Sequence, residues 1–359
     1  MTMTKGGLLD EPSAFRRLDP KGMLDILSGV AGQVAQSLAS ARNFQWTPPP
    51  RVRRILACGM GGSAIGADLA SALLGPQMSA PLSIVRDYRL PGGAGPETLA
   101  FVCSYSGDTG EALACWSEAM QRNCSVVAVT SGGSLARQAN RLNVPLATLP
   151  AGLPPRTAYM HPCLLILRCL QDLGIGPGSL TAIELSIPFL QSGIDRSSPE
   201  TPLQDNPAKR LAVELQGRIP IVYASERLAA TGKRWADQFC ENSKQLAFAC
   251  PMSEAVHNQI AGWKHPAPRI GGFQPVLLRD REDDSRLQSQ MEALAEGFEE
   301  MGVAAVECWT EGESWEERLW SLVLLGDYCS VYLGFLNRED PVEIAAIDRL
   351  KEKISQTNG

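Results

Sequence analysis

The chain carries no excess of positive charge. Its 33 lysines and arginines are outnumbered by 39 aspartates and glutamates, which gives a formal net charge of −6 at pH 7. Proteins that bind nucleic acids use clustered lysines and arginines to neutralise phosphates. The charge balance therefore argues against a nucleic-acid partner. A small anion stays a candidate ligand, because a pocket can be locally positive in an acidic protein.

The sequence also lacks the apolar segments that export and membrane insertion require. The N-terminal stretch MTMTKGGLLDEPSAF contains no apolar core of a signal peptide. No run approaches the roughly 18 apolar residues of a membrane-spanning helix. We therefore expect a cytoplasmic protein that has no membrane partner.

Cysteine pairs of the C-x-x-C type are absent, although the chain has 10 cysteines. Several of them lie in apolar runs, as Cys58 does at the end of Ile-Leu-Ala-Cys. This spacing indicates neither a disulfide scaffold nor a zinc site. We expect free cysteines in the core of a protein from a reducing compartment, and no bound metal.

The pattern of apolar residues predicts an N-terminal helical region followed by alternating strands and helices. Helical spacing over residues 14–43 ends before Pro48-Pro49-Pro50. The strands predicted next are 51–58, 82–85, 99–103, 125–130 and 144–148. The first helix after the strand 51–58 is predicted to start after the glycine-rich stretch 59–66 and to run through Leu74. Further helices are predicted at 109–122, 133–141 and 158–172.

A second alternation follows a connection bracketed by Gly174–Gly178 and Ser197–Pro202. Its predicted strands are 219–224, 245–249 and 275–278, and its predicted helices are 206–215, 228–244, 284–301, 313–335 and 341–355. Pro341 suits the first turn of the last helix. The alternation favours an α/β fold with a doubly wound, flavodoxin-like parallel sheet in each half. We divide the chain into a helical extension (1–50), a first domain (51–195) and a second domain with the C-terminal helix (196–359).

Two strand-to-helix loops of the first domain are rich in glycine and hydroxyl groups and contain no lysine or arginine. The residues concerned are Gly61, Gly62 and Ser63 after the first strand, and Ser104, Ser106 and Thr109 after the third. In an open parallel sheet, ligands collect at the carboxyl ends of the strands, where helix N-termini present partly positive amide groups. Glycines let an anion approach the backbone. The loops therefore predict a phosphate site built of N–H and O–H donors.

Two other interpretations of these loops stay open on the residues alone. Gly59-Met-Gly-Gly-Ser-Ala64 approaches the G-x-G-x-x-G fingerprint of a dinucleotide site, with alanine in the last position. The Ser/Thr loop could also be an ordinary turn in which Thr109 or Asp108 caps the next helix. The occurrence of both loops at matching places in one sheet favours the phosphate site.

The motifs resemble those of the sugar isomerase (SIS) domain family, whose Ser/Thr loop binds phosphosugars. The segments that carry the resemblance are Gly59-Met-Gly-Gly-Ser63, Ser104-Tyr-Ser-Gly-Asp-Thr109-x-Glu111 and Thr130-Ser-Gly-Gly133. Further segments are similar to the bifunctional phosphoglucose/phosphomannose isomerases, namely Leu153-Pro-Pro-Arg156-Thr-Ala-Tyr159, Glu241-Asn-Ser-Lys244, His257-Asn-Gln-Ile-Ala-Gly-Trp263 and Leu350-Lys351. The resemblance covers nearly the whole chain from about residue 50 and implies two SIS domains.

The resemblance implies an isomerase that needs no cofactor and no metal. It would open the ring of glucose 6-phosphate and move a proton between C2 and C1 through an enediol. Glu241 would be the base. His257 would help to open the ring and would reach the site from the other subunit of a homodimer. Arg156 would stabilise the enediolate, and Lys351 would contact the ring oxygen.

These residue types suit the implied chemistry. Glu241 has an apolar sequence neighbourhood, which favours a base, and an imidazole exchanges protons near physiological pH. Arg156 follows two prolines, which would fix a cation in place. Simpler interpretations stay open: a solvated Glu241 beside Lys244, a structural histidine, a surface arginine, and a solvated helix face around Lys351. His161 and His265 lack such a context and are taken as structural.

One departure bears on the substrate. Family members that accept mannose 6-phosphate carry a threonine shortly before the terminal lysine, where this chain has Pro341-Val-Glu-Ile-Ala-Ala346. Use of mannose 6-phosphate therefore stays open. Two other functions stay as alternatives. One is a non-catalytic phosphosugar-binding protein, which has no need of Glu241, His257 and Arg156 together. The other is a different SIS enzyme that acts on a sugar phosphate.

Overall fold

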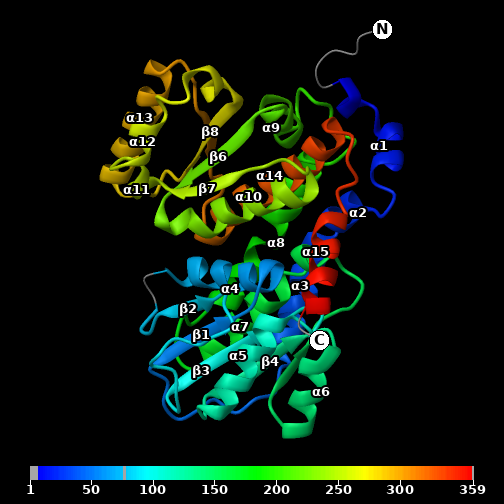
Figure 1. Cartoon of the computed structure of the whole chain (residues 1–359), viewed down its shortest axis with the longest axis vertical. Coiled ribbons are helices and arrows are strands. Elements are labelled where there is room, and N and C mark those ends of the chain that lie inside the picture. Colours follow the sequence, from blue (N-terminus) through cyan, green and yellow to red (C-terminus); the bar gives the residue numbers. More distant parts are fainter. Residues whose placement is uncertain (1–6, 76–77, 358–359) are drawn as a thin grey trace. The chain divides into compact units, whose positions relative to one another are not determined.

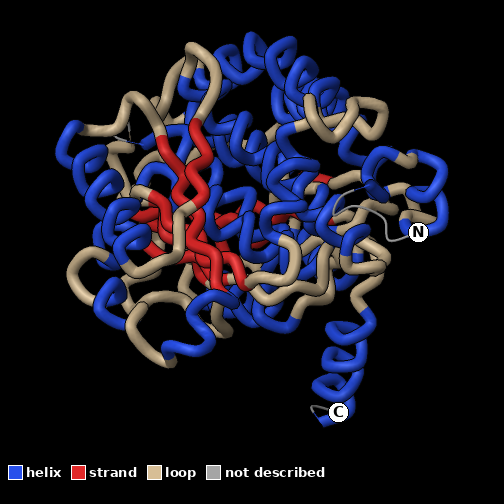
Figure 2. Tube along the Cα trace, turned by 90° about the horizontal axis from the view of Figure 1, so that it is seen from above, coloured by secondary structure: helices blue, strands red, loops and turns tan. Residues whose placement is uncertain are grey.

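The computed structural model describes residues 7–75 and 78–357. They form two compact units, each with a parallel sheet flanked by helices, as the sequence predicts (Figure 1). Helices surround the strands of the sheets (Figure 2). The N-terminal unit comprises Gly29–Gln191 and Gly312–Leu319. The C-terminal unit comprises the residues up to Ser28, Ser192–Glu311 and the chain from Trp320 onward. Residues 1–6 of the N-terminal stretch, in which no signal peptide is expected, lie outside the described part.

Five parallel strands form the sheet of the N-terminal unit, in the order β2-β1-β3-β4-β5. They are β1 (Arg54–Cys58), β2 (Leu82–Val85), β3 (Thr98–Cys103), β4 (Ser125–Thr130) and β5 (Leu146–Thr148). Every residue of the central strand β3 is buried, so its sequence is a continuous apolar run instead of an alternating one. The strand order reverses between β1 and β3, which is the flavodoxin-like arrangement.

Helices cover both faces of this sheet. They are α3 (Val30–Arg42), α4 (Gly61–Leu74), α5 (Gly110–Gln121), α6 (Gly133–Leu142), the 3-10 helix η3 (Pro155–Thr157), α7 (Met160–Asp172) and most of α8 (Ser179–Arg196). Leu56, Ala100 and Ala128 point from one face toward Trp116 of α5 and Leu135 of α6. Right-handed connections place α4 on the other face, where it packs against α7, and α7 packs against α3.

Four parallel strands form the sheet of the C-terminal unit, in the order β7-β6-β8-β9. They are β6 (Ile219–Ala224), β7 (Phe248–Pro251), β8 (Phe273–Arg279) and β9 (Val306–Trp309). This order repeats that of β2-β1-β3-β4, so the two units share one architecture. On one side of the sheet, Trp263 and Tyr223 pack against Phe298, with ring centroids 4.8 and 5.5 Å away.

The helices of the C-terminal unit come from three segments of the chain. The first segment supplies η1 (Gly7–Asp10), α1 (Pro12–Leu18) and α2 (Met23–Ser28). The later segments supply α9 (Pro207–Leu215), η4 (Glu226–Leu228), α10 (Ala229–Asn242), α11 (Met252–Ala255), α12 (Gln259–Gly262), η5 (Ala267–Gly272), α13 (Ser285–Glu300), most of α14 (Trp315–Leu336) and α15 (Ala345–Thr357). α14 is long and apolar enough to span a membrane by composition, but 83% of its apolar window is buried inside the protein.

The helical region predicted over residues 14–43 is confirmed, but it is divided into three helices, α1, α2 and α3. α1 ends at Leu18, two residues before Pro20, since the residue that precedes a proline is disfavoured in a helix. The carboxylate of Asp19 then accepts hydrogen bonds from the N–H groups of Met23 and Leu24 at 2.7 and 2.8 Å, which starts α2.

Some predicted elements begin or end at other residues in the structure, and some elements of the structure were not predicted. The segment expected to connect the two halves contains α8, and β9 has no counterpart in the prediction. The strand predicted at 245–249 lies at Phe248–Pro251. The last helix begins at Ala345 and not at Pro341, because the carboxylate of Asp340 accepts the N–H of Val342 at 2.8 Å and holds a turn there.

The cysteines are free, as predicted. Seven of the ten are buried: Cys58, Cys103, Cys115, Cys163, Cys169, Cys308 and Cys329. Burial raises the pKa of the Cys103 thiol to about 12, so this thiol stays protonated at neutral pH and packs as a small apolar group.

His161 is buried between α7 and α3 in the N-terminal unit. Its side chain is 5% exposed, and its Nδ1 lies 2.8 Å from the hydroxyl of Ser37. Its Nε2 is buried without a hydrogen-bond partner in the described part of the chain. Burial therefore lowers the pKa of His161, since the imidazolium would lose its hydration.

We expect acidification to destabilise the N-terminal unit through His161. Because its pKa is lower in the folded than in the unfolded chain, the stabilisation is complete above the unfolded value of about 6.5 and is lost as the pH falls below it. Urea denaturation of the wild type and of His161→Gln, at about pH 7.5 and 5.5, measures this effect. The variant should lose less stability on acidification than the wild type. The expectation would be contradicted if the wild type and His161→Gln lost equal stability on acidification. It would also be contradicted if the exposed control His265→Gln reduced the loss as much as His161→Gln does.

α14 packs so closely on α10 that glycine is required at Gly326. A Cβ at this position would lie 2.2 Å from Nε1 of Trp235. The indole cannot move aside easily, because it is fully buried and donates a hydrogen bond to the carbonyl oxygen of Leu322 at 2.8 Å.

We therefore expect Gly326→Ala to lower the free energy of unfolding by about 1–3 kcal/mol through overpacking. Gly32→Ala is the matched control, because Gly32 also lies inside a helix but has no atom within 4 Å of the added Cβ. This control should be neutral or stabilising by up to about 1 kcal/mol. Thermal denaturation compares the two variants. Equal changes in stability would show that close contact with Trp235 does not require glycine at position 326.

Candidate active site

The candidate phosphate loops meet at the point where the strand order reverses. The loop after β1 and the loop after β3 leave neighbouring strands, and their helices α4 and α5 lie on opposite faces of the sheet. Such a switch point is the usual ligand site of doubly wound sheets. We call the residues 59–63, 104–109, 130–134 and 154–157 the loop site.

α4 begins inside the glycine-rich loop, at Gly61, and not after Gly66 as predicted. Gly61 has a φ of 49°, a conformation that favours glycine. Met60 before it is extended and 36% exposed. The first N–H groups of α4 therefore belong to Gly61 and Gly62, where the helix dipole places a partial positive charge.

The glycines bring α4 against its neighbours. A Cβ at Gly62 would lie 2.3 Å from the carbonyl oxygen of Pro155 and 2.8 Å from Cα of Arg156. A Cβ at Gly59 would lie 2.7 Å from the carbonyl oxygen of Cys103 at the end of β3. Glycine at these positions thus sets the spacing between the first loop, β3 and the Arg156 segment.

Ser104 organises the second loop from within. Its side chain is 2% exposed, and its oxygen accepts the N–H groups of Gly107 and Thr109 at 3.0 and 3.4 Å. Its own hydroxyl hydrogen is donated to Oγ1 of Thr109 at 2.9 Å. In this arrangement Ser104 orients Thr109.

Ser63, Ser106 and Thr109 use their hydroxyl oxygens as acceptors within the loop site. Ser63 accepts the N–H of Tyr105 at 3.1 Å, and Ser106 accepts the N–H of Asp108 at 3.3 Å. Thr109 accepts from Ser104. Because each accepts through a lone pair, its hydroxyl hydrogen can be donated to a ligand.

Asp108 does not cap the helix that follows it. Thr109 occupies the N-cap position of α5, as one alternative interpretation of the loop has it, but no side chain makes a capping hydrogen bond there. The carboxylate of Asp108 accepts the N–H of Ser134 at 2.9 Å, in the first turn of α6. Hydrogen bonding to Ser134 holds the pKa of Asp108 below its ordinary value. The negative charge is therefore compensated by α6.

A third loop, which follows β4, packs on the second one. A Cβ at Gly107 (φ 77°) would lie 1.9 Å from the carbonyl oxygen of Gly132, so no other residue fits there. The N–H and the hydroxyl of Ser131 both donate to the carbonyl oxygen of Tyr105, at 3.0 and 2.6 Å. The Thr130-Ser-Gly-Gly133 motif thus supports the backbone of the Ser/Thr loop.

Arg156 is the basic residue of the loop site. It lies in η3, is only 3% exposed and is next to Gly62 of α4. Tyr105 ties the Ser/Thr loop to the segment before it, because its hydroxyl donates to the carbonyl oxygen of Pro150 at 2.8 Å and accepts the N–H of Leu153 at 2.9 Å. Tyr105 was not predicted as a site residue. Its position inside the hydroxyl motif was the only signal in the sequence.

This arrangement can hold a phosphate group. The N-termini of α4 and α5 adjoin the hydroxyl groups of Ser63, Ser106 and Thr109, and the backbone of buried Arg156 lies next to Gly62. Helix N-termini and hydroxyl donors together stabilise an oxyanion. The charge of Asp108 does not oppose this, because it is directed to α6.

The corresponding position of the C-terminal unit has the opposite chemistry. The loops after β6 and β8 carry Ser225, Asp280 and Asp283, and Asp280 is almost fully buried. Asp280 accepts the hydroxyl of Thr310 at 3.0 Å and lies 3.8 Å from Arg227. Burial and the neighbouring Asp280 raise the pKa of Asp283. The buried carboxylate of Asp280 and the neighbouring Asp283 make this switch point less favourable for a phosphate than the loop site.

Glu241 lies in the last turn of α10 and is partly buried. The apolar neighbourhood expected from the sequence is only partly formed: Phe239 is buried, whereas Leu246 and Phe248 are 55% and 46% exposed. Nζ of Lys244 donates to the backbone carbonyl oxygen of Glu241 at 3.0 Å.

His257 is exposed in the turn between α11 and α12. The same segment is anchored a few residues later, where Nε1 of buried Trp263 donates to the hydroxyl of Tyr223 at 2.9 Å. Lys351 lies on α15, and all side chains from Ala346 to Ile354 are exposed. Glu241, His257 and Lys351 therefore lie in the C-terminal unit, and the loop site with Arg156 lies in the N-terminal unit.

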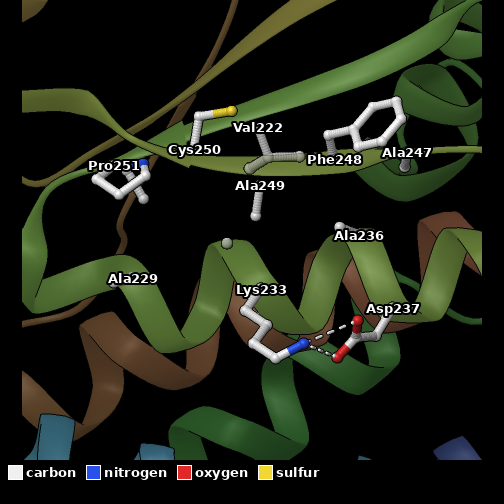
Figure 3. A pocket seen from close by; sticks show the side chains of 12 residues that line it. Val222, Ala229, Lys233, Ala236, Asp237, Ala247, Phe248, Ala249, Cys250 and Pro251 are labelled. Carbon is white, nitrogen blue, oxygen red and sulfur yellow. Dashed lines mark hydrogen bonds and ion pairs between the residues drawn. The ribbon is translucent and has the colours of Figure 1, made fainter. Parts of the chain in front are cut away.

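A groove of about 360 Å³ between α10 and β7 has a different character (Figure 3). Its walls are mostly small apolar side chains such as Val222 and Ala236, and the ion pair of Lys233 and Asp237 lies beside it, with Nζ 2.9 Å from the carboxylate. None of the candidate site residues lines it. Its apolar lining is unsuited to a phosphosugar.

Comparison with known proteins identifies relatives over most of the chain. The family model described as "Bacterial phospho-glucose isomerase C-terminal SIS domain" matches residues 204–354. A bifunctional phosphoglucose/phosphomannose isomerase from Caldicellulosiruptor bescii is 33% identical over 306 residues, which are 85% of this chain and 90% of the relative. The enzyme of the same name from Aquifex aeolicus is 31% identical over 303 residues, with 84% and 90% covered.

A solved structure shows the same fold. A hypothetical protein from Thermus thermophilus superposes with a TM-score of 0.77 over 98% of this chain and 95% of its own, at 16% sequence identity. The sequence relatives, and not this structural likeness, decide the family. On their identity and coverage, the chain belongs to the SIS-domain family of bifunctional phosphoglucose/phosphomannose isomerases.

Proposed function

We propose that this protein is a homodimeric phosphosugar isomerase of the cytoplasm that interconverts glucose 6-phosphate and fructose 6-phosphate. The observation that carries the proposal is the loop site, where hydroxyl groups, helix N-termini and buried Arg156 adjoin in a chain of an isomerase family. The free cysteines are in keeping with a reducing compartment.

The phosphate group would be held by Gly61, Gly62, Ser63, Ser106 and Thr109, with Ser104 orienting Thr109. The amide groups of the helix N-termini and the hydroxyl groups supply the donors. Because most of these groups are fixed by hydrogen bonds within the loop site, little reorganisation is needed on binding, which keeps its entropic cost low.

The reacting end needs a base and a cation. In the proposed mechanism, Glu241 removes the C2 proton of open-chain glucose 6-phosphate and returns it to C1 of the enediol, while a proton moves from the C2 oxygen to the C1 oxygen. Arg156 would stabilise the negative charge of the enediolate. Lys351 would contact the ring oxygen while the ring opens.

The topology of the C-terminal unit supports a contribution of His257 from a second subunit. α10 follows β6 and runs antiparallel to the strands, so Glu241 at its end lies toward the amino ends of the strands. His257 follows β7 and lies toward their carboxyl ends. A helix of 14 residues spans about 21 Å at 1.5 Å per residue. The two residues thus lie toward opposite ends of the strands in one C-terminal unit, and this placement supports the proposal that His257 acts from a second copy.

Two narrower questions accompany the proposal. Pro341–Ala346 contains no threonine, so the use of mannose 6-phosphate stays open and is tested beside that of glucose 6-phosphate. A non-catalytic phosphosugar-binding protein is the alternative function, and it predicts binding without turnover.

We expect Glu241→Gln to lower kcat for conversion of fructose 6-phosphate by at least about 100-fold, because the amide cannot accept the C2 proton. KM should change little, since the phosphate is held by the loop site. The measurement is a coupled assay that detects glucose 6-phosphate and, separately, mannose 6-phosphate.

Glu214→Gln is the matched control, because Glu214 also precedes the last residue of a helix in the same unit. It should keep the wild-type kcat. A wild type that forms neither product would refute the isomerase proposal. A fully active Glu241→Gln would refute only the assignment of the base.

Glu241→Gln and His257→Ala should each be inactive alone. We also expect activity to return in mixed dimers that contain one chain of each variant. If His257 acts across the subunit boundary, a dimer with one chain of each kind has one intact site. Random pairing of equal amounts should then recover roughly a quarter of the wild-type activity for a two-fold symmetric dimer. Co-expression with two different affinity tags gives the mixed dimer. No recovery would indicate that His257 acts within its own chain or not at all.

A further inference from the structure

A ladder of buried polar side chains connects α10 to α14. Arg234, Gln238 and Asn242 recur every four residues, so they lie on one face of α10. All three are nearly or fully buried, at 2%, 2% and 0% exposure. Their partners on α14 are Asp327 and Ser330, which are fully buried as well.

Each rung of the ladder is a hydrogen bond or ion pair. The guanidinium of Arg234 lies 2.7 Å from the carboxylate of Asp327, and Nε2 of Gln238 donates to the same carboxylate at 3.3 Å. Nδ2 of Asn242 donates to the hydroxyl oxygen of Ser330 at 2.8 Å. Ser330 in turn donates to the backbone carbonyl oxygen of Asp327 at 2.7 Å, which orients its oxygen toward Asn242.

The last rung lies directly beside Glu241. Asn242 binds the side chain of Ser330, and the hydroxyl of Ser243 donates to the backbone carbonyl oxygen of Ser330 at 2.8 Å. Nδ2 of Asn337 donates to the carbonyl oxygen of Ser243 at 3.0 Å. Gly334 completes the contact, because a Cβ there would lie 2.7 Å from the carbonyl oxygen of Asn242. The backbone that follows Glu241 is therefore held by α14 from several directions.

Stability alone does not account for such a ladder. Buried polar pairs lose hydration, and apolar pairs of similar size can stabilise a helix contact as well or better. Directional hydrogen bonds do fix one rotation and one register of α10 on α14. Rotation matters here, because a shift by one residue turns a helical side chain by about 100°. The ladder therefore sets the direction in which Glu241 points.

We propose that Ser330 is a positioning residue for Glu241, acting through Asn242 and Ser243. This inference rests on the proposed function, in which Glu241 is the base. Loss of the Ser330 hydroxyl leaves Asn242 without this acceptor and lets the end of α10 move. A displacement of about 1 Å can cost up to roughly 100-fold in rate when reacting atoms must be aligned.

Ser330→Ala should lower kcat for fructose 6-phosphate by about 10-fold, with KM changed less than about two-fold, because the phosphate loops are untouched. Ser186→Ala is the matched control. Ser186 is also a buried helical serine, and it donates to the carbonyl oxygen of Ile183 at 2.7 Å, three residues earlier, as Ser330 does. It should keep the wild-type kcat, and both variants should melt within a few degrees of each other.

A double-mutant cycle decides whether Ser330 acts through the base. In the Glu241→Gln background, measured at high enzyme concentration, Ser330→Ala should have no further effect on kcat, since there is no carboxylate left to position. Gly334→Ala, whose Cβ would press on the carbonyl oxygen of Asn242 from the next turn of α14, should lower kcat like Ser330→Ala and also lose its effect in this background.

The possible results separate the proposals. A Ser330→Ala enzyme with the kcat of Ser186→Ala would overturn the positioning role, as would a kcat loss that persists in the Glu241→Gln background. Both results leave the isomerase function intact. A wild type without isomerase activity would remove the proposed function and this inference together. A kcat loss that is confined to enzymes with Glu241 supports the role of Ser330.

Discussion

The reversal of strand order between β1 and β3 is the constraint on which the candidate site depends. Parallel strands on either side of this point send α4 and α5 to opposite faces of the sheet, so two helix N-termini point to one place. That geometry supplies partial positive charge before any side chain is chosen. It explains how a loop with no lysine or arginine of its own can accept a phosphate group.

The sequence of the loop site follows from the need to bring backbones together at this place. Glycine is required where α4 meets Pro155 and where Gly107 meets Gly132, because a Cβ would lie within 2.3 Å of a carbonyl oxygen at both positions. Hydroxyl groups then link the loops by hydrogen bonds, as Ser63 does to Tyr105 and Ser104 does to Thr109. The C-terminal unit has the same strand order but places carboxylates at its switch point. The shared fold therefore gives different chemistry in the two units.

Much of the fold and the phosphate loops could be predicted from the sequence. Short apolar runs such as Thr98–Cys103, bounded by turn residues, favour buried parallel strands, and their alternation with helical segments predicts the sheet. Details that depend on one side-chain contact were missed, including the turn made by Asp19, the start of α15 and the partner of Asp108. The ladder between α10 and α14 could not be predicted either, because its partners are about 90 residues apart in the chain and no local pattern pairs them.

The central claim is that the protein moves a proton between C2 and C1 of a hexose 6-phosphate through a carboxylate. The most direct test is conversion of fructose 6-phosphate in D₂O, with the product followed by proton NMR. A carboxylate base exchanges its proton with solvent during the reaction, so the account predicts deuterium at C2 of the glucose 6-phosphate that forms. Conversion without any deuterium at C2, or no conversion by the wild type, would contradict it.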